Sequence, residues 1–462
     1  MAVASQSQGV RGGPAAGWRN AAAYLRDPLP YLESVARTGG PVANVPFPGG
    51  HSFHFVSDPD LVRRVLVDEH ASFVKGRALR AARRLLGDGL LTSEGGDHLR
   101  RRRMIQPVFR RAVIEAYGAE MVAAAERTSA RWRSGIELDI DTAMTDLALD
   151  IVGRTIFNAD VESEASEIRD VLEAGMRVFH RFLLPGGELL WHLPLPATRG
   201  FNSARDEFDH MMRALIRSRN GAAQDPPDLI DHLTMLEADG GGGRLSETEI
   251  RDEAVTLLLA GHETTARALT WAWHLLTLYP DAATKLRAEL GAVLGDRPPT
   301  AADYAQLPYT RAVFCETLRL YPPVWALARI AVREVDLGHL VVPDGGTVIM
   351  SQWVMHRNPE LFEHALAFRP ERWLDGPEPH PGAYFPFGGG PRLCIGERFA
   401  MLEGVLVLAT LAQRWEVETQ DGAPRIDARF TLRPRGGLRA RIRAASSGHA
   451  RLRSDGGDAR SL

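Results

Sequence analysis

The chain has 462 residues, 45% of them hydrophobic, and a formal net charge of −3 from 55 basic and 58 acidic residues. This length allows a large core, in one big domain or a few fused ones, and the balanced charge gives no overall attraction to nucleic acid or to an anionic membrane. The two cysteines, Cys315 and Cys394, exclude a disulfide framework and a cysteine-based zinc site, which favours a reducing, cytoplasmic setting.

Both ends of the chain are rich in small and polar residues. We therefore expect residues 1–20 and 444–462 to be disordered, with one folded domain over residues 21–443. The first thirty residues lack the apolar stretch of a signal peptide or of a membrane anchor. We expect a protein that is neither secreted nor anchored.

Between these ends the predicted elements are mostly helical. Residues 42–57, VANVPFPGGHSFHFVS, alternate apolar and polar side chains around a Pro-Gly-Gly break, which predicts a strand hairpin. Residues 58–320 carry mainly helical patterns, and two further β-like stretches follow at residues 327–350 and 414–442. The sequence therefore predicts a mainly α protein with a small β region.

A long helix is expected after the glycine run DGGGGR, residues 239–244. Because no Lys-Ser or Lys-Thr follows this run, a flexible linker is a better interpretation than a phosphate-binding loop. Ser246 and Glu249 then form a capping box, and no proline follows until Pro280. At about 1.5 Å per residue, this predicts a helix about 50 Å long, which is enough to cross the molecule.

The middle of this helix reads AGHETT, from Ala260 to Thr265, and interrupts an inner side of leucine, valine and alanine. Thr264 can donate to the carbonyl of Ala260 and bend the helix, while Gly261 lets another group approach the backbone. A tolerated irregularity with solvent-facing polar residues is the alternative interpretation. A zinc protease is excluded, because Ala266 stands where the H-E-x-x-H pattern needs its second histidine.

The next helix ends with an acid and a base on one face. Glu316 and Arg319 lie three residues apart before two prolines, so their side chains are neighbours. Such pairs usually lie on a surface, but the apolar neighbours here indicate a buried pair that needs further hydrogen bonds. The sequence PERW supplies a second arginine, Arg372, and Cys315 is expected to be a small core residue.

The other cysteine lies in FPFGGGPRLCIGERFA, residues 385–400. Cys394 precedes a helix, whose N-terminal amides and dipole stabilise a thiolate. Glycines such as Gly388 and Gly396 leave room for a flat, bulky partner and let amide hydrogens point at the sulfur. No C-x-x-C-H motif occurs and this stretch has no histidine for a cysteine protease, so a haem with one axial thiolate remains.

With these four motifs the chain resembles the cytochrome P450 family, the haem-thiolate monooxygenases. AGHETT, ETLR, PERW and FGGGPRLCIG occur in the family's order between residues 260 and 400, and the last is close to diagnostic. The resemblance implies a triangular prism of helices around a buried haem b, with residues 21–443 as the catalytic domain. It also implies a cytoplasmic bacterial enzyme that uses O2.

The resemblance implies residue roles at the cofactor. Cys394 is the iron ligand, and Phe387 packs against it. Propionate-binding side chains are expected at His98, Arg102, Arg329 and Arg392. Small residues are expected beside the haem at Ala260, Gly261, Gly388 and Gly396. The remaining arginines of GDHLRRRRMIQP are interpreted as a solvated basic face or as a contact for an acidic redox protein, and these are Arg100, Arg101 and Arg103.

The same resemblance implies the chemistry. Thr264 and Glu263 deliver protons for oxygen activation, with Glu263 as the connection to solvent. The family's buried structural triad corresponds to Glu316, Arg319 and Arg372. Because two cysteines cannot hold an iron–sulfur cluster and no flavin module fits, electrons are expected from NAD(P)H through a ferredoxin reductase and a ferredoxin. A peroxide-driven oxygenase and a non-catalytic thiolate-ligated haem sensor are the alternatives.

A hydrophobic small molecule is the expected substrate. The family's pocket walls correspond to Leu257, Ala260, Val324, Leu327 and Thr431. The apolar run LLPGGELLWHLPLP, within residues 178–201, is interpreted as a lid, with helix packing as the alternative. A loose likeness of LPLPATRGFN to bacterial terpene oxidases suggests a terpenoid or another secondary metabolite.

Overall fold

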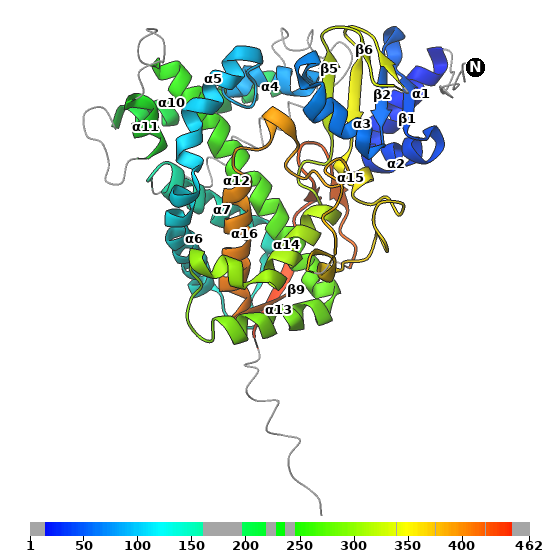
Figure 1. Ribbon diagram of the computed structural model, residues 1–462. Helices are drawn as coiled ribbons and strands as arrows, with labels where there is room; N and C mark the ends of the chain where they lie inside the picture. Colours follow the sequence, from blue (N-terminus) through cyan, green and yellow to red (C-terminus); the bar gives the residue numbers. More distant parts are fainter. Residues whose placement is uncertain are drawn as a thin grey trace, which may run out of the picture.

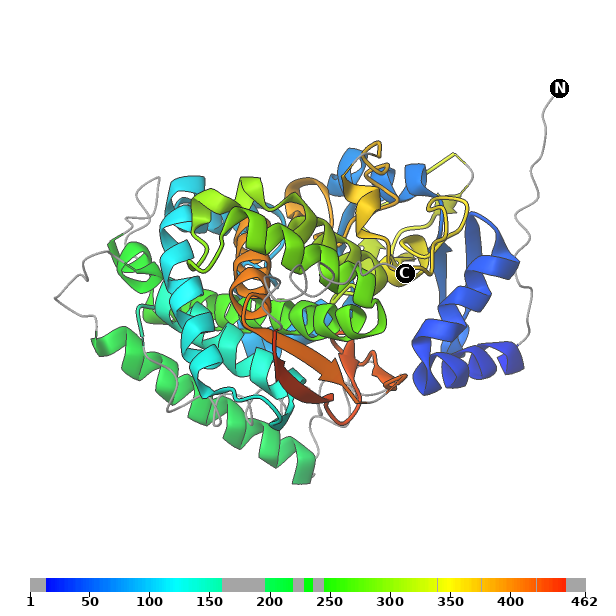
Figure 2. The ribbon, with the colours of Figure 1, turned by 90° about the horizontal axis from the view of Figure 1, so that it is seen from below.

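The computed structural model describes residues 14–159, 196–218, 228–235 and 245–445, apart from residues 339, 375 and 421. Helices dominate this part of the chain, and the strands form small sheets (Figure 1). Seen from below, most helices gather on one side of the molecule, and the N-terminal helices lie with the largest sheet on the other (Figure 2). The predicted mainly α architecture with a small β region is confirmed.

The chain begins with helices α1 (Pro14–Arg26) and α2 (Pro28–Gly39). The expectation of disorder up to residue 20 is therefore wrong for residues 14–20. A Cβ atom on Gly17 would lie 2.8 Å from the carbonyl carbon of Phe47, so α1 is fixed against the turn of the first hairpin. Residues 1–13 and 446–462, the rest of the two predicted disordered ends, lie outside the described residues.

One five-stranded sheet joins the two β-like regions that frame the helical part of the sequence. Its order is β1-β2-β8-β5-β3, and its strands are Val42–Pro46, Ser52–Val56, Thr347–Met350, Leu327–Ala331 and Phe73–Lys75. The predicted hairpin is present, with β1 and β2 antiparallel. At the far edge, β3 and β5 pair so that Lys75 lies opposite Arg329.

The remaining strands of the described residues form three smaller sheets, and all of them except β4 come from the part of the sequence after residue 334. A three-stranded sheet has the order β4-β12-β9, formed by Glu137–Asp139, Arg439–Ala444 and Trp415–Thr419. Two short antiparallel pairs join β6 (Val335–Asp336) to β7 (Val341–Val342) and β10 (Ile426–Asp427) to β11 (Arg433–Pro434). Strands were therefore predicted correctly in both residues 327–350 and residues 414–442.

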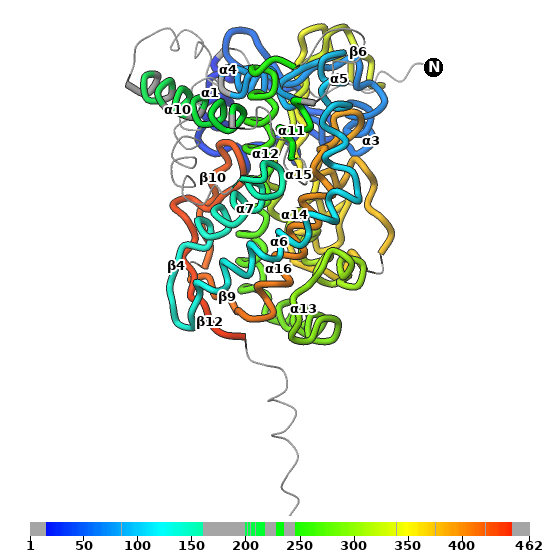
Figure 3. Tube along the Cα trace, turned by 90° about the vertical axis from the view of Figure 1, so that its left-hand side faces the viewer, coloured from blue at the N-terminus to red at the C-terminus, as the bar shows by residue number. Residues whose placement is uncertain are grey.

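Helix α12 (Glu247–Leu278) runs through the centre of the molecule (Figures 1 and 3). It begins with the predicted capping box of Ser246 and Glu249, and most of its residues are buried. It packs against α7 (Ile140–Ile156), α14 (Pro308–Leu320) and α16 (Glu397–Ala412), and α6 (Arg111–Arg131) packs on α16. Its central place puts AGHETT among these helices.

Shorter helices complete the described fold. They are α3 (Pro59–Arg63), α4 (Arg77–Leu86), α5 (Gly95–Ile105), α10 (Pro196–Ser218), α11 (Leu229–Met235), α13 (Pro280–Val293) and α15 (Gln352–Met355). Single helical turns occur at Pro48–Gly50, Arg64–Asp68, His70–Ser72, Gln106–Phe109, Ala301–Gln306, Pro370–Trp373 and Gly390–Arg392. None of the helices in the described ranges has the length and apolar character that a membrane crossing requires.

Candidate haem site

Cys394 lies in a tight loop just before α16. Its amide donates to the carbonyl of Phe387 over 3.0 Å, which closes the loop on itself. Gly388 and Gly390 have φ angles of +76° and +66°, in the left-handed region that glycine adopts without strain. A Cβ atom on Gly390 would also lie 2.1 Å from the carbonyl oxygen of Leu66. These glycines are therefore needed for the shape of the loop and for its close contact with Leu66.

The sulfur of Cys394 is open to approach, because the side chain is exposed. A Cβ atom on Gly396 would lie 3.9 Å from the sulfur, so this glycine leaves ordinary van der Waals space beside it. Burial nevertheless raises the pKa of the Cys394 thiol, more than the hydrogen bond from Gly396 lowers it. The thiolate state of Cys394 therefore stays a prediction, and a coordinated iron ion would favour it, because a metal ion deprotonates the thiol that binds it.

On α12, the AGHETT turn presents a small-residue face. Ala260 is exposed, and Gly261 and Thr264 are partly exposed, on a helix that is otherwise largely buried. Thr264 Oγ donates to the carbonyl of Ala260 over 2.8 Å, the bond expected from the sequence. A Cβ atom on Gly261 would lie 3.2 Å from Val152, so the group that approaches this glycine closely is α7.

Glu263 does not reach solvent. Its side chain is 2% exposed, and its Oε1 accepts a hydrogen bond from Thr431 Oγ over 2.6 Å. Within the described ranges its Oε2 is buried without a partner. The expected connection of Glu263 to solvent is therefore not direct. Thr431, expected to line the substrate pocket, is 4% exposed, and its hydroxyl binds Glu263 instead of facing an open pocket. The solvent-facing interpretation of the AGHETT polar residues fails for His262, Glu263 and Thr265, which are buried, whereas Thr264 is partly exposed.

Of the other predicted pocket residues, Leu257 is buried, whereas Val324 and Leu327 are partly exposed. Leu327 lies beside the cysteine loop, since its Cδ1 atom would be 3.7 Å from a Cβ atom on Gly388. The expected lid cannot be placed, because residues 160–195 lie outside the described part of the chain. The linker at residues 239–244 lies outside it too.

Cationic side chains gather beside the cysteine loop. Arg102 of α5 donates to the carbonyl of Leu393 over 2.7 Å, directly before the cysteine. Arg392 donates to the carbonyl of Phe73 and pairs with Glu94 at 2.5 Å. Its Nη1 is buried and has no partner among the described residues. A buried guanidinium with a free N–H is placed to receive an anion.

His98 and Arg329 lie in the same cluster and are both buried. Burial, together with the nearby charges of Lys75, Arg392, Arg102 and Arg329, lowers the pKa of His98 to about 4. Burial also lowers the pKa of Arg329 to about 10, with a contribution from Arg392. The cluster is thus short of negative charge, and the two propionates of a haem would supply it.

Sequence reasoning missed Lys75 as a member of this cluster. It is 5% exposed, and burial lowers its pKa to about 7, opposed by Glu94. The sequence did offer one sign that Lys75 is special. Lysine is rare in this chain, and Lys75 and Lys285 are its two lysines.

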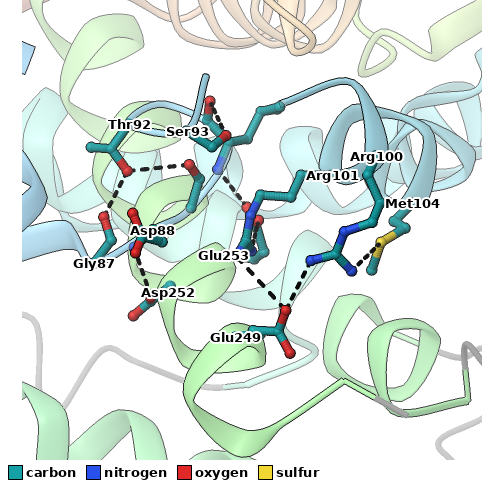
Figure 4. A network of polar contacts seen from close by, with 12 residues as sticks. Gly87, Asp88, Thr92, Ser93, Arg100, Arg101, Met104, Glu249, Asp252 and Glu253 are labelled. Carbon is teal, nitrogen blue, oxygen red and sulfur yellow. Dashed lines mark hydrogen bonds and ion pairs between the residues drawn. The ribbon is translucent and has the colours of Figure 1, made fainter. Parts of the chain in front are cut away.

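The other arginines of α5 differ from the prediction (Figure 4). Arg101 is 6% exposed and bonds Glu253 of α12 at 2.7 Å, while Arg100 bonds Glu249 at 2.9 Å. Arg103 is exposed. The interpretation as a solvated basic face or a partner contact is therefore wrong for Arg101, and Arg100 is held in an ion pair between two helices.

The acid–base pair of α14 is fully buried. Arg319 binds Glu316 through two N–H···O bonds of 2.8 Å, and both residues are 0% exposed. Arg372 donates to Glu316 over 3.2 Å, so the structure brings the three predicted triad residues together. Trp373, which sequence reasoning missed, donates its indole N–H to Glu316 over 2.8 Å. Satisfied charges of this kind can remain in a core.

Cys315, beside this pair, is less buried than expected of a core residue. Burial still raises the pKa of its thiol to about 11. A thiol with so high a pKa is a poor nucleophile and metal ligand at neutral pH. This leaves Cys394 as the cysteine that suits a metal.

An exposed sulfur before α16, a small-residue face on α12 and a buried cluster of unbalanced cations together define a haem-thiolate protein. Residues 22–438 match the family model described as Cytochrome P450. Among curated proteins, cyclooctatin synthase of Streptomyces melanosporofaciens is 37% identical over 416 residues, covering 88% of this chain and 90% of that protein. Cyclooctat-9-en-7-ol 5-monooxygenase of the same organism is 36% identical over 404 residues, covering 87% of each.

Among solved structures, that of CYP175A1 from Thermus thermophillus matches with a TM-score of 0.76 and 32% identity, covering 94% of this chain and 99% of that chain. The chain belongs to the cytochrome P450 family. It is a monooxygenase with haem as its cofactor, so the predicted fold, enzyme class and cofactor are confirmed.

Proposed function

We propose that the protein inserts one oxygen atom of O2 into a C–H bond of a terpenoid. Support comes from two relatives, one named as cyclooctatin synthase and the other as a 5-monooxygenase of cyclooctat-9-en-7-ol, a cyclic alcohol of the terpenoid kind. The described pocket positions suit such a substrate, since Ala260, Val324 and Leu327 are apolar and at least partly exposed. We place the enzyme in the bacterial cytoplasm, in line with its Streptomyces relatives.

The observation that carries the proposal is the exposed Ala260–Thr264 face of α12, where an apolar surface holds one hydroxyl. A haem with a thiolate ligand supplies dioxygen activation, and electron donation from the sulfur favours cleavage of the O–O bond. Thr264 Oγ gives its hydrogen to the carbonyl of Ala260, which leaves its lone pairs to accept from a water molecule and hold it in place.

We assign the proton reserve to Glu263. Its Oε1 is occupied by the Thr431 hydroxyl, so a proton would be taken up and released at Oε2, which has no partner among the described residues. A buried carboxyl next to Thr264 in the sequence is suited to general acid–base work. Because the side chain is closed off from solvent, its proton exchange requires a rotation of Glu263 or of Thr431.

For electron supply we propose a ferredoxin, reduced by its NAD(P)H-dependent reductase. A groove of about 850 Å³ lies behind the cysteine loop and includes Phe387 and Leu393 in its lining. Four arginines also line it, and these are Arg63, Arg111, Arg311 and Arg398. Two glutamates of the lining balance them only in part, so an acidic protein surface would be attracted to this side.

The substrate proposal is tested by titrating the purified protein with cyclic terpene hydrocarbons, terpene alcohols and fatty acids while following the Soret band. We expect the terpenoids to displace water from the iron and shift the band. Products formed under ¹⁸O2 should carry one heavy oxygen. Fatty acids as the better ligands would overturn the terpenoid class, and substrate binding without NADPH-dependent product would favour the sensor.

The partner proposal is tested with Arg398→Glu, which reverses one charge of the groove. We expect slower reduction by ferredoxin, a weaker dependence on salt and unchanged substrate binding. Arg133→Glu is the matched control, because Arg133 is exposed just beyond the other end of α6, the helix that begins with Arg111. Equal effects of both variants, or full turnover with hydrogen peroxide alone, would contradict the ferredoxin route.

A further inference from the structure

Lys75 ends strand β3 in an unusual electrostatic environment. It lies opposite Arg329 of β5 in the antiparallel ladder, and the two residues are 5% and 7% exposed. Side chains that face each other across a ladder point to the same side of the sheet. Two buried like charges therefore meet here, an arrangement that costs free energy unless an anion lies between them.

Lys75 is also bound to residues 87–94, which connect α4 to α5 and are called the α4–α5 segment below. Its Nζ donates to the carbonyls of Leu90 at 3.0 Å and Ser93 at 2.7 Å, and its backbone N–H donates to Glu94 at 2.6 Å. An ammonium group has three N–H donors. The described residues take two of them, so one remains for another acceptor.

The α4–α5 segment is held from its other side by α12 (Figure 4). The amide of Leu90 donates to Glu253 at 2.8 Å, and a Cβ atom on Gly89 would lie 2.2 Å from the hydroxyl oxygen of Thr256. The segment thus lies between α12 and Lys75. Hydrogen bonds within the segment, such as that from Thr92 Oγ to the carbonyl of Gly87 at 2.6 Å, set its local turn. Its position in the molecule depends on the contacts with α12 and Lys75.

The nearest carboxylate does not balance the charges. Glu94 accepts the backbone N–H of Lys75 and pairs with Arg392, which precedes the cysteine by two residues. Arg392 Nη1, within the part of the chain that the structure describes, has no acceptor. Lys75, Arg329 and the partly buried Arg392 therefore share the carboxylate of Glu94, because Glu253, which also acts on Lys75, is paired with Arg101. A haem would bring two more carboxylates.

We propose that Lys75 binds a haem propionate with its remaining N–H and so couples haem binding to the order of the α4–α5 segment. Haem then stabilises the contacts of Leu90 and Ser93, and by reciprocity these contacts hold the haem more tightly. The α4–α5 segment is in this way fixed between α12 and Lys75 when the cofactor binds.

The first test needs no substitution. Hydrogen exchange is measured on the wild-type protein before and after reconstitution with haem. We expect the amides of the α4–α5 segment to slow at least tenfold, because a bond to an ionised group stabilises the closed state. Amides of α13, which lies away from the cluster, give the baseline. Equal slowing in both regions would overturn the coupling.

The second test uses Lys75→Met, which keeps the length of the side chain and removes the ammonium. We expect haem to pass to apomyoglobin roughly tenfold faster than from the wild type. Haem should also no longer protect the α4–α5 segment. The control is Lys285→Met, which removes the other lysine, a surface residue paired with Glu371 at 2.6 Å.

A merely structural role for Lys75 predicts a different pattern. The α4–α5 segment would then exchange faster both with and without haem, and haem transfer would stay at the wild-type rate. Either result would contradict the proposal. If Lys75→Met does not fold, Lys75→Gln replaces it, and the wild-type exchange experiment decides the coupling by itself.

Discussion

The amide of Phe385 donates a hydrogen bond to Nε2 of His356 over 3.0 Å. His356 is 0% exposed, and its own carbonyl accepts a hydrogen bond of 2.6 Å from Arg319. Phe385 begins the loop that ends at Cys394. The histidine therefore joins the buried Glu316–Arg319 pair to the backbone that presents Cys394, the expected iron ligand.

His356→Leu should loosen this connection. It leaves the Phe385 N–H buried without an acceptor, which costs about 1–3 kcal/mol. We expect a lower thermal midpoint and a larger fraction of ferrous carbonyl complex without the red-shifted thiolate band. The control is His364→Leu, because His364 is 64% exposed and should change the midpoint little. An unchanged spectrum with a lower thermal midpoint would show that His356 stabilises the fold but does not affect the thiolate ligand.

The same histidine predicts acid sensitivity. Burial and the nearby charge of Arg319 together lower the pKa of His356 to about 3. The unfolded chain binds a proton near pH 6.5, so this site contributes full stability above that pH and loses it as pH falls toward 3. We expect the free energy of unfolding, measured by urea titration, to fall by up to about 1.4 kcal/mol per pH unit because of this group, and His356→Leu should reduce the slope.

Glu316→Gln should unfold the protein far more easily. Removing the carboxylate leaves Arg319 buried and unpaired, which costs about 3–5 kcal/mol. The comparison is Glu126→Gln, whose partner Arg414 lies 3.5 Å away with half its side chain exposed, and which should cost less than about 1 kcal/mol. Urea unfolding followed by circular dichroism measures the free energy of unfolding of both variants. Equal losses would show that the buried pair stabilises the fold no more than the surface pair does.

Thr264→Ala should uncouple electron use from product formation. The hydroxyl that we propose to hold a water molecule is lost, so NADPH consumption should continue while product falls and peroxide rises. Thr277→Ala removes a similar hydroxyl further along α12, where Thr277 donates to the carbonyl of Trp273 at 3.0 Å. The ratio of product to NADPH measures the effect, and an unchanged ratio for Thr264→Ala would remove this residue from proton delivery.

Cys394→Ala should abolish the red-shifted band of the ferrous carbonyl complex, because that band requires a thiolate on iron. Cys315→Ala, which changes the other cysteine of the chain, should keep it. Persistence of the band in Cys394→Ala would assign the axial ligand to another residue.

Contacts between residues close in the chain were predictable from the sequence. The capping box of Ser246 and Glu249, the bond from Thr264 to Ala260 and the pair Glu316–Arg319 all span three or four residues on one helix. The regular geometry of a helix brings such residues together wherever the helix lies. The four motifs likewise sufficed for the family.

Contacts between distant segments were decided by packing. Glu263 was expected at solvent, but the turn that carries Thr431 covers it, and Arg101 was expected on a surface, but α12 lies over it. Lys75 meets Arg329 only because two strands far apart in the sequence pair in one register. The sequence by itself determined the fold class and the local hydrogen bonds, and it singled out Cys394 as the expected iron ligand. The tertiary structure decided which charges are buried together, because burial depends on the whole packed chain and not on neighbouring residues.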